Sequence, residues 1–248
     1  MASSEHVRPS GAQAGEAWWL QVIPTVLGLS AFGLYATVRA FEGAFYEWGP
    51  YLSPFYSPLI DPHHHYWPFS PALLILAGPL GFRVTCYYYR KAYYRAFFLD
   101  PPGCAVAERP GRRYSGETKF PFILQNLHRY FMYLGIVFIL FLWHDAVRSF
   151  FFDNGFGVGV GSLVLTLNVT LLTLYLLSCH SLRHLVGGKL DCFSCVSFGN
   201  ARNAGWKGVS SLNGHHMLFA WISLFGVGFA DFYVRMVASG MIHDVRLF

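Results

Sequence analysis

Apolar residues gather into five long stretches along the chain, separated by shorter polar segments. Each stretch holds about 20 residues, the length that an α-helix needs to cross a hydrocarbon core of about 30 Å. Inside lipid, the backbone N–H and C=O groups must form their hydrogen bonds within their own segment, so the pattern predicts helices. The stretches lie near residues 18–38, 70–89, 122–147, 158–185 and 212–238.

The arrangement of these stretches predicts a single domain over residues 1–248. We find no internal repeat of about 20 to 50 residues and no linker that divides the chain. The expected fold class is therefore an all-α integral membrane protein, a bundle of five transmembrane helices.

The polar loops predict how this bundle is oriented. Seven Lys and Arg residues lie in the loop 90–119 and three in the loop 189–207, whereas the loop 40–69 carries acidic residues and no Lys or Arg. Basic loops stay on the cytoplasmic side of a membrane. We therefore expect the N-terminus in the cytoplasm and the C-terminus outside.

The composition supports a membrane protein and excludes two other classes. Hydrophobic residues make up 54% of the chain and charged residues 12%, and the mean hydropathy is +0.37. So few charged side chains could not cover a soluble domain, and so many apolar ones exclude a disordered chain. The net charge is +5. In a membrane protein, basic residues in loops indicate which side of the membrane each loop occupies, so we expect no nucleic-acid partner.

Histidine and cysteine side chains gather at one depth of the predicted bundle. Titratable groups inside a membrane are costly, so they are candidates for function. Among the intramembrane histidines only His144 lies toward the outer side. The residues at the cytoplasmic ends of the predicted helices are Cys86, His128, Cys179, His180, His184, His215 and His216, with Cys192 and Cys195 in the next loop.

Four side chains in and after the fourth stretch predict a metal site. His180 and His184 stand four residues apart, so they share one helix face. Cys192 and Cys195 form a C-x-x-C pair whose thiolates can chelate one ion, and the Gly-Gly bend at 187–188 can fold them back to the helix end. This set suits a structural zinc or, with two ligands per iron, a Rieske-type 2Fe–2S cluster.

Other residues at the same depth leave the complete ligand set open. His215 and His216 on the fifth stretch can supply the imidazoles instead, and Cys86 and Cys179 can supply thiolates. The structural alternative is a set of reduced thiols with histidines that hydrogen-bond between helices.

Two short motifs beside these histidines resemble those of a known family. Leu127-His128-Arg129 resembles the S-x-x-H-R segment of the membrane-anchor subunits of succinate dehydrogenase, and Leu182-Arg183-His184-Leu185 resembles their G-x-R-H-L segment. The five-span layout also resembles the diheme cytochrome b anchors of succinate:menaquinone oxidoreductases and fumarate reductases. Since the first two stretches contain no histidine, at most one heme b, between His184 and His215 or His216, is compatible with the resemblance.

The resemblance implies the membrane anchor of respiratory complex II, in the cytoplasmic membrane of a bacterium. The implied partners are an FAD-containing flavoprotein that oxidises succinate and an iron–sulfur subunit that passes electrons to the membrane. In this chain we expect the electrons to pass through the Cys/His iron–sulfur site to a quinone, which we expect to be menaquinone. We expect His128, Arg129 and Tyr130 at the quinone, where Arg129 stabilises negative charge and His128 or Tyr130 donates a proton. Contact of Arg129 with lipid phosphate is the alternative.

Three other functions compete with this interpretation. They are a heme-containing cytochrome b anchor, a zinc-stabilised scaffold without redox activity, and a small transporter, which should show paired halves that this chain lacks. Asp231 and Arg235 stand four residues apart on the last stretch. They predict an ion pair within the bilayer or, alternatively, part of a proton route.

Overall fold

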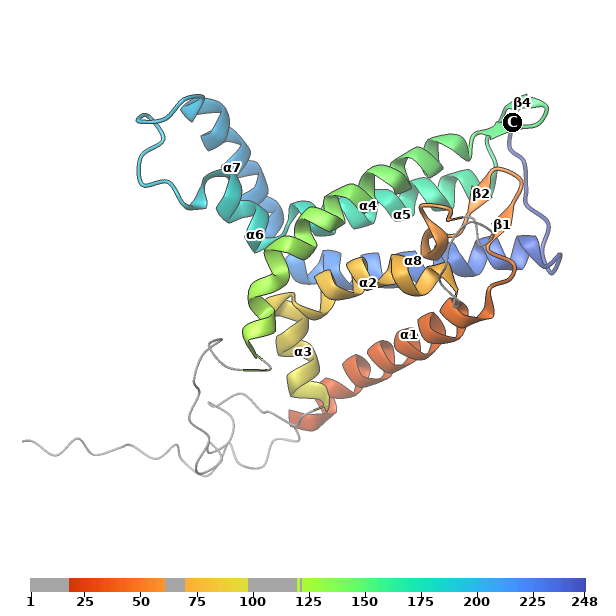
Figure 1. Ribbon diagram of the computed structural model, residues 1–248, viewed down its shortest axis with the longest axis horizontal. Coiled ribbons are helices and arrows are strands. Elements are labelled where there is room, and N and C mark those ends of the chain that lie inside the picture. Colours follow the sequence, from red (N-terminus) through yellow and green to blue (C-terminus); the bar gives the residue numbers. More distant parts are fainter. Residues whose placement is uncertain (1–17, 61–69, 98–119, 121) are drawn as a thin grey trace, which may run out of the picture.

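The computed structural model describes residues 18–60, 70–97, 120 and 122–248. Their helices form one bundle, in which α5 (Val160–Leu177) packs against α8 (His216–Ala238) and α4 (His128–Arg148), as Figure 1 shows. Two short hairpins lie at one end of the bundle and a separate helix, α7 (Gly199–Asn213), projects at the other. The loop 100–119 and the histidines at 63–65 lie outside the described residues.

Four helices of the described residues are long and apolar enough to cross a membrane. They are α1 (Ile23–Glu42), which follows a 3-10 turn at Trp18–Val22, and α4, α5 and α8. Large apolar side chains on their outer faces are exposed, among them Leu34, Leu140 and Phe229, as a lipid-facing surface requires. The prediction of a helical membrane protein is thus confirmed, whereas the count of five spans is not.

The second predicted stretch is divided between two helices. Helix α2 (Pro71–Val84) is N-capped by Ser70, whose hydroxyl accepts a hydrogen bond from the backbone N–H of Ala72. It has 14 residues, so it is about 21 Å long at 1.5 Å per residue, shorter than the hydrocarbon core. The chain bends after Thr85, and α3 (Tyr87–Phe97) leaves in another direction (Figure 1).

The fourth predicted stretch is interrupted in the same way. Helix α5 ends at Leu177, and Cys179 has an extended backbone before the short helix α6 (His180–Arg183) and a π-helical turn at His184–Gly188. The last stretch also starts later than predicted, because α7 ends at Asn213 and α8 is a new helix from His216.

Small residues bring α2 close to α4, which begins after a 3-10 turn at Phe122–Leu127. A Cβ atom added at Gly81 would clash with the ring of Phe131, and one at Gly78 would lie 2.7 Å from the ring of Phe138. Neither position therefore has room for a larger residue. Close approach at glycines is the usual way in which helices pack inside a membrane, where burial from water supplies no driving force between them.

The end of the bundle that carries the hairpins is closed by the segment after α1 and by the C-terminal tail. The hairpin β1 (Glu47–Trp48) with β2 (Tyr51–Leu52) precedes a 3-10 turn at Pro54–Tyr56, which is buried. The second hairpin pairs β3 (Phe151–Phe152) with β4 (Gly155–Phe156). Asp244 in the tail accepts hydrogen bonds from Tyr51 and Tyr233, each at 2.6 Å. Burial and this carboxylate raise the pKa of Tyr51.

Candidate functional site

Four side chains from four helix ends, three of them buried and one, His128, half-buried, form what we call the Cys/His cluster. Cys86 follows α2, His128 opens α4, Cys179 follows α5 and His216 opens α8. Cys86 and Cys179 are 2% and 1% exposed and belong to one hydrophobic core. They meet there because both helix breaks, after α2 and after α5, occur at the same level of the bundle.

The cluster consists of two cysteine–histidine pairs that cross between helices. The sulfur of Cys86 lies 3.3 Å from Nε2 of His216, and the sulfur of Cys179 lies 3.2 Å from Nε2 of His128. Phe82 stacks on His128, Tyr175 stacks on His216, and the rings of Phe82 and Tyr175 meet edge to face. Both cysteines belong to the same hydrophobic core, so the two pairs form one site.

Two hydroxyl groups decide which nitrogen of each imidazole carries the hydrogen. Thr85 donates to the carbonyl of Gly81 at 2.6 Å, so its oxygen accepts from Nδ1 of His128, 2.9 Å away. Ser178 donates to the carbonyl of Tyr175 at 2.8 Å and accepts from Nδ1 of His216 at 2.7 Å. Both histidines thus carry hydrogen on Nδ1, and both Nε2 lone pairs face a sulfur.

Aromatic rings hold the two imidazoles in place. Phe82 stacks on His128 with centroids 4.8 Å apart and 5° between the planes. Tyr175 stacks on His216 at 5.1 Å and 19°. An imidazole whose Nδ1–H is held by a hydrogen bond and whose Nε2 lone pair faces a thiol has the orientation that metal-binding histidines show.

The four donors are two imidazoles and two thiols, and the structure pairs each thiol with one imidazole. Two imidazoles and two thiols are the ligands of a Rieske-type 2Fe–2S cluster, in which each iron takes only two protein ligands. A tetrahedral zinc site needs its ligands to converge on one point. Within residues 18–60, 70–97 and 122–248, no three His, Cys, Asp or Glu side chains converge in that way.

The structure does not bring together the ligand set expected from the sequence. Cys192 and Cys195 are joined by a disulfide bond, so they have no free thiolates to offer. His184 contacts Arg129, and His215 lies near the carbonyl of Ser211. His180 is exposed, and of the six predicted ligands only His216 belongs to the cluster. The structure instead brings together Cys86, His128, Cys179 and His216.

The expected quinone residues divide between two places. His128 lies in the cluster, whereas Arg129 and Tyr130 are exposed on the outer surface of α4. Nη2 of Arg129 lies 3.1 Å from Nδ1 of His184. The structure therefore groups Arg129 with His184 beside the cluster, a pairing that the sequence did not predict.

A signal for the missed cluster residues is visible in the sequence once the fold is known. Each cluster cysteine directly follows a hydroxyl residue, in Thr85-Cys86 and in Ser178-Cys179. In each dipeptide the hydroxyl holds one histidine and the sulfur faces the other. The two dipeptides thus have equivalent roles on opposite sides of the site.

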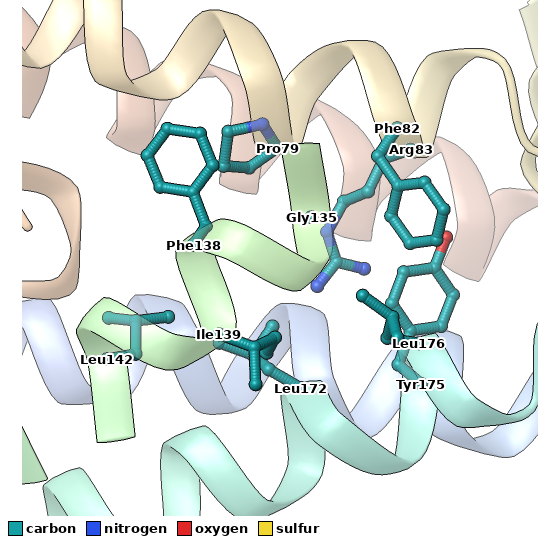
Figure 2. Close-up of a pocket in the computed structure, with 10 residues that line it drawn as sticks. All are labelled: Pro79, Phe82, Arg83, Gly135, Phe138, Ile139, Leu142, Leu172, Tyr175 and Leu176. Carbon is teal, nitrogen blue, oxygen red and sulfur yellow. The ribbon is translucent and has the colours of Figure 1, made fainter. Parts of the chain in front are cut away.

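An apolar pocket of about 60 Å³ lies beside the cluster, between α2, α4 and α5 (Figure 2). Arg83 reaches into it from α2, and Tyr175 borders it from α5. The guanidinium of Arg83 donates to the hydroxyl of Tyr89 at 2.6 Å, to the carbonyl of Ala220 and to Ser223. A cation thus lies close to the cluster on the side of the bundle interior.

Comparisons with known proteins agree with the resemblance seen in the sequence. The model of a family described as actinobacterial succinate dehydrogenase subunit SdhC matches residues 20–240, which include all four members of the cluster. The chain is also similar to a chain of the solved Mycobacterium smegmatis Sdh1 complex in the apo form. Their sequences are 44% identical over 99% of this chain and 97% of that one, with a TM-score of 0.85. No curated protein matches the chain.

Proposed function

Because the chain belongs to the family of actinobacterial succinate dehydrogenase SdhC subunits, we propose that it passes electrons to quinone through an iron–sulfur centre held by the Cys/His cluster. As the membrane anchor of this complex, the chain is a multi-pass protein of the bacterial inner membrane. Its partners are a flavoprotein subunit, an iron–sulfur subunit, quinone and membrane lipids.

The observation that carries the proposal is the pair of Nε2 lone pairs that face two buried sulfurs. Cys86 and Cys179 would provide thiolates and His128 and His216 imidazoles. A bound 2Fe–2S cluster supplies one-electron transfer, and its imidazole ligands raise the reduction potential above that of an all-cysteine cluster. Such a potential favours acceptance of electrons from the iron–sulfur partner.

The neighbouring residues position the ligands and exclude water. Thr85 and Ser178 hold the hydrogen on Nδ1 of each histidine, so that Nε2 is kept available. Phe82 and Tyr175 cover one face of each ring. Burial among these side chains limits solvent access and further tunes the potential.

The cluster end of the bundle faces the cytoplasm in this proposal. Exposed lysines lie on α3, α7 and the turn between α6 and α7, namely Lys91, Lys207 and Lys189. These elements lie at the end opposite the hairpins (Figure 1). Basic residues at that end support the orientation predicted from the loops, with the C-terminus outside. The iron–sulfur partner then docks next to the cluster.

Quinone binds beside the cluster at Arg129, His184 and Tyr130 in this proposal. Arg129 donates to a quinone oxygen and stabilises the negative charge that reduction places there, and His184 or Tyr130 delivers a proton. Two electrons and two protons convert quinone to quinol, and the electrons come from succinate through the partner subunits. His128, which the sequence also placed at the quinone, serves instead as a ligand of the cluster.

Cys86→Ser and Cys179→Ser test the proposal. Each variant should remove one 2Fe–2S signal from the electron paramagnetic resonance spectrum of the reduced complex, while the partner's signals and dye-linked succinate oxidation persist. Cys192→Ser is the matched control and should keep every signal. A full set of signals in both cluster variants, or sharp optical bands of a reduced heme in the parent, would overturn the proposal.

A further inference from the structure

The hydroxyl of Tyr175 is buried without a partner. Tyr175 is 2% exposed on α5, and its hydroxyl oxygen has no hydrogen-bond partner within the described part of the chain. A buried hydroxyl normally donates and accepts, and leaving it unpaired costs free energy. A bound group that accepts a hydrogen bond from this hydroxyl would remove the cost.

The surroundings of Tyr175 place this hydroxyl at the Cys/His cluster. Its ring stacks on His216 and meets the edges of Phe82 and Tyr89. In Figure 2 the side chain extends from α5 toward α2, with the hydroxyl beside Phe82. The sulfur of Cys86 lies 3.3 Å from Nε2 of the stacked His216. A sulfur at the Cys/His cluster is therefore the acceptor that the hydroxyl hydrogen would reach.

Arg83 adds a positive charge on the same side. Its guanidinium carbon lies 4.7 Å from the centroid of the Tyr175 ring and 5.5 Å from that of Tyr89. Its hydrogen bonds go to a phenol, a carbonyl and a serine, and within the described residues no carboxylate neutralises it. Burying an unneutralised cation in a membrane interior costs free energy, which indicates that Arg83 interacts with a negatively charged group.

We propose that Tyr175 and Arg83 are positioning residues that raise the reduction potential of the iron–sulfur centre, Tyr175 by donating its hydroxyl hydrogen to a sulfur and Arg83 by its charge. This inference rests on the proposed function. Reduction adds one electron from the iron–sulfur partner, and the added negative charge is stabilised by a hydrogen-bond donor to sulfur and by a nearby cation. The electron then leaves to quinone, and neither residue changes its covalent state.

Redox titration of the 2Fe–2S signal in the whole complex tests the inference. Tyr175→Phe keeps the ring that stacks on His216 and removes only the donor. We expect about a tenfold lower equilibrium constant for one-electron reduction, a shift of the midpoint by about 59 mV to more negative potential, with the signal intact. Tyr133→Phe, an exposed tyrosine of α4, is the control and should leave the midpoint in place.

Arg83 offers a second and independent readout. Arg83→Gln should also lower the midpoint, whereas Arg83→Lys, which keeps the charge, should restore most of it. An intact signal with an unchanged midpoint in Tyr175→Phe and in Arg83→Gln overturns the inference and leaves the proposed function standing. A parent complex without a 2Fe–2S signal beyond those of the partner overturns both.

Discussion

At the scale of single residues, two hydroxyl groups decide what the cluster histidines can bind. Thr85 and Ser178 each donate to a backbone carbonyl of their own helix. Their oxygens can then only accept from the histidines, which fixes the hydrogen on Nδ1. Without these hydroxyls the imidazoles could carry hydrogen on Nε2 and would present a donor, instead of a lone pair, to the site.

Thr85→Val and Ser178→Ala test this role. We expect about a 10- to 100-fold loss of metal affinity, because a partner of a ligating imidazole contributes about that much. The measurement is the iron content and resonance signal of the purified complex during titration with a chelator. Thr170→Val is the control, because the Thr170 hydroxyl donates to a carbonyl of its own helix at 2.8 Å, away from the cluster. Equal resistance to the chelator in all variants would contradict the assignment of the tautomers.

Arg129 is a second question at the scale of single residues. Its guanidinium either binds quinone, as proposed, or contacts lipid phosphate. Arg129→Leu should lower quinone reduction by about 100- to 1000-fold, the usual effect of removing one donor to a developing negative charge. Succinate oxidation with an artificial acceptor should not change. Arg148→Leu, at the opposite end of α4, is the matched control. Quinone turnover equal to that of the parent would assign Arg129 to lipid phosphate.

At the scale of elements, hydropathy located the helices but not the breaks within them. The apolar pattern continues through Thr85-Cys86 and Ser178-Cys179, so stretches 70–89 and 158–185 were predicted as uninterrupted. In the structure α2 and α5 end there, because backbone and side-chain hydrogen bonds to preceding carbonyls close each helix. These helix ends depend on local hydrogen-bond geometry. A hydropathy average over about 20 residues does not detect them.

The same limit explains what was predicted of the site. The depth at which His and Cys gather is predicted by their positions at helix ends and by the loop charges that orient the helices. His216 is among the expected ligands. The partners of Cys86 and Cys179 could not be predicted, because they come from helices that are distant in sequence. The C-x-x-C motif was a stronger local signal, but Cys192 and Cys195 bond to each other.

Helices α1 and α8 are joined at the hairpin end of the bundle by a buried ion pair. Asp231 and Arg235 are 0% and 1% exposed, and Nε of Arg235 donates to the Asp231 carboxylate at 2.9 Å. Tyr35 of α1 also donates to Asp231, at 2.6 Å, and Glu42 accepts from Arg235 at 2.9 Å. This network supports the ion pair predicted from the sequence, with every charge paired.

Asp231→Asn should destabilise the complex by about 3–5 kcal/mol, because it leaves part of a buried cation unpaired. The thermal unfolding temperature of the purified complex measures this loss. Quinone turnover at low temperature should stay near that of the parent. Asp153→Asn, in an exposed outer turn, should change neither quantity. A variant of normal stability that has lost turnover would instead assign Asp231 to a proton route.

At the scale of the whole molecule, the two ends of the bundle have different surfaces. One end is closed by the hairpins and the tail, where Asp244 accepts hydrogen bonds from Tyr51, Tyr233 and the N–H of Gly161. The other end carries α3, α6 and α7 beyond the long helices, as Figure 1 shows. The cluster lies at this second end, where electrons from the partner subunits would enter. A short path from partner to cluster thus requires docking there.

Charge reversal at this end tests the docking. Lys189 and Lys207 are exposed, and charges at the rim of an interface mainly affect the rate of association and its dependence on salt. The double variant Lys189→Glu with Lys207→Glu should release succinate-oxidising activity from membranes at a lower salt concentration than the parent does. Asp153→Lys changes charge at the outer end and should release none. If the control released the soluble subunits and the double variant did not, the proposed orientation would be reversed, because the partners would then bind at the hairpin end.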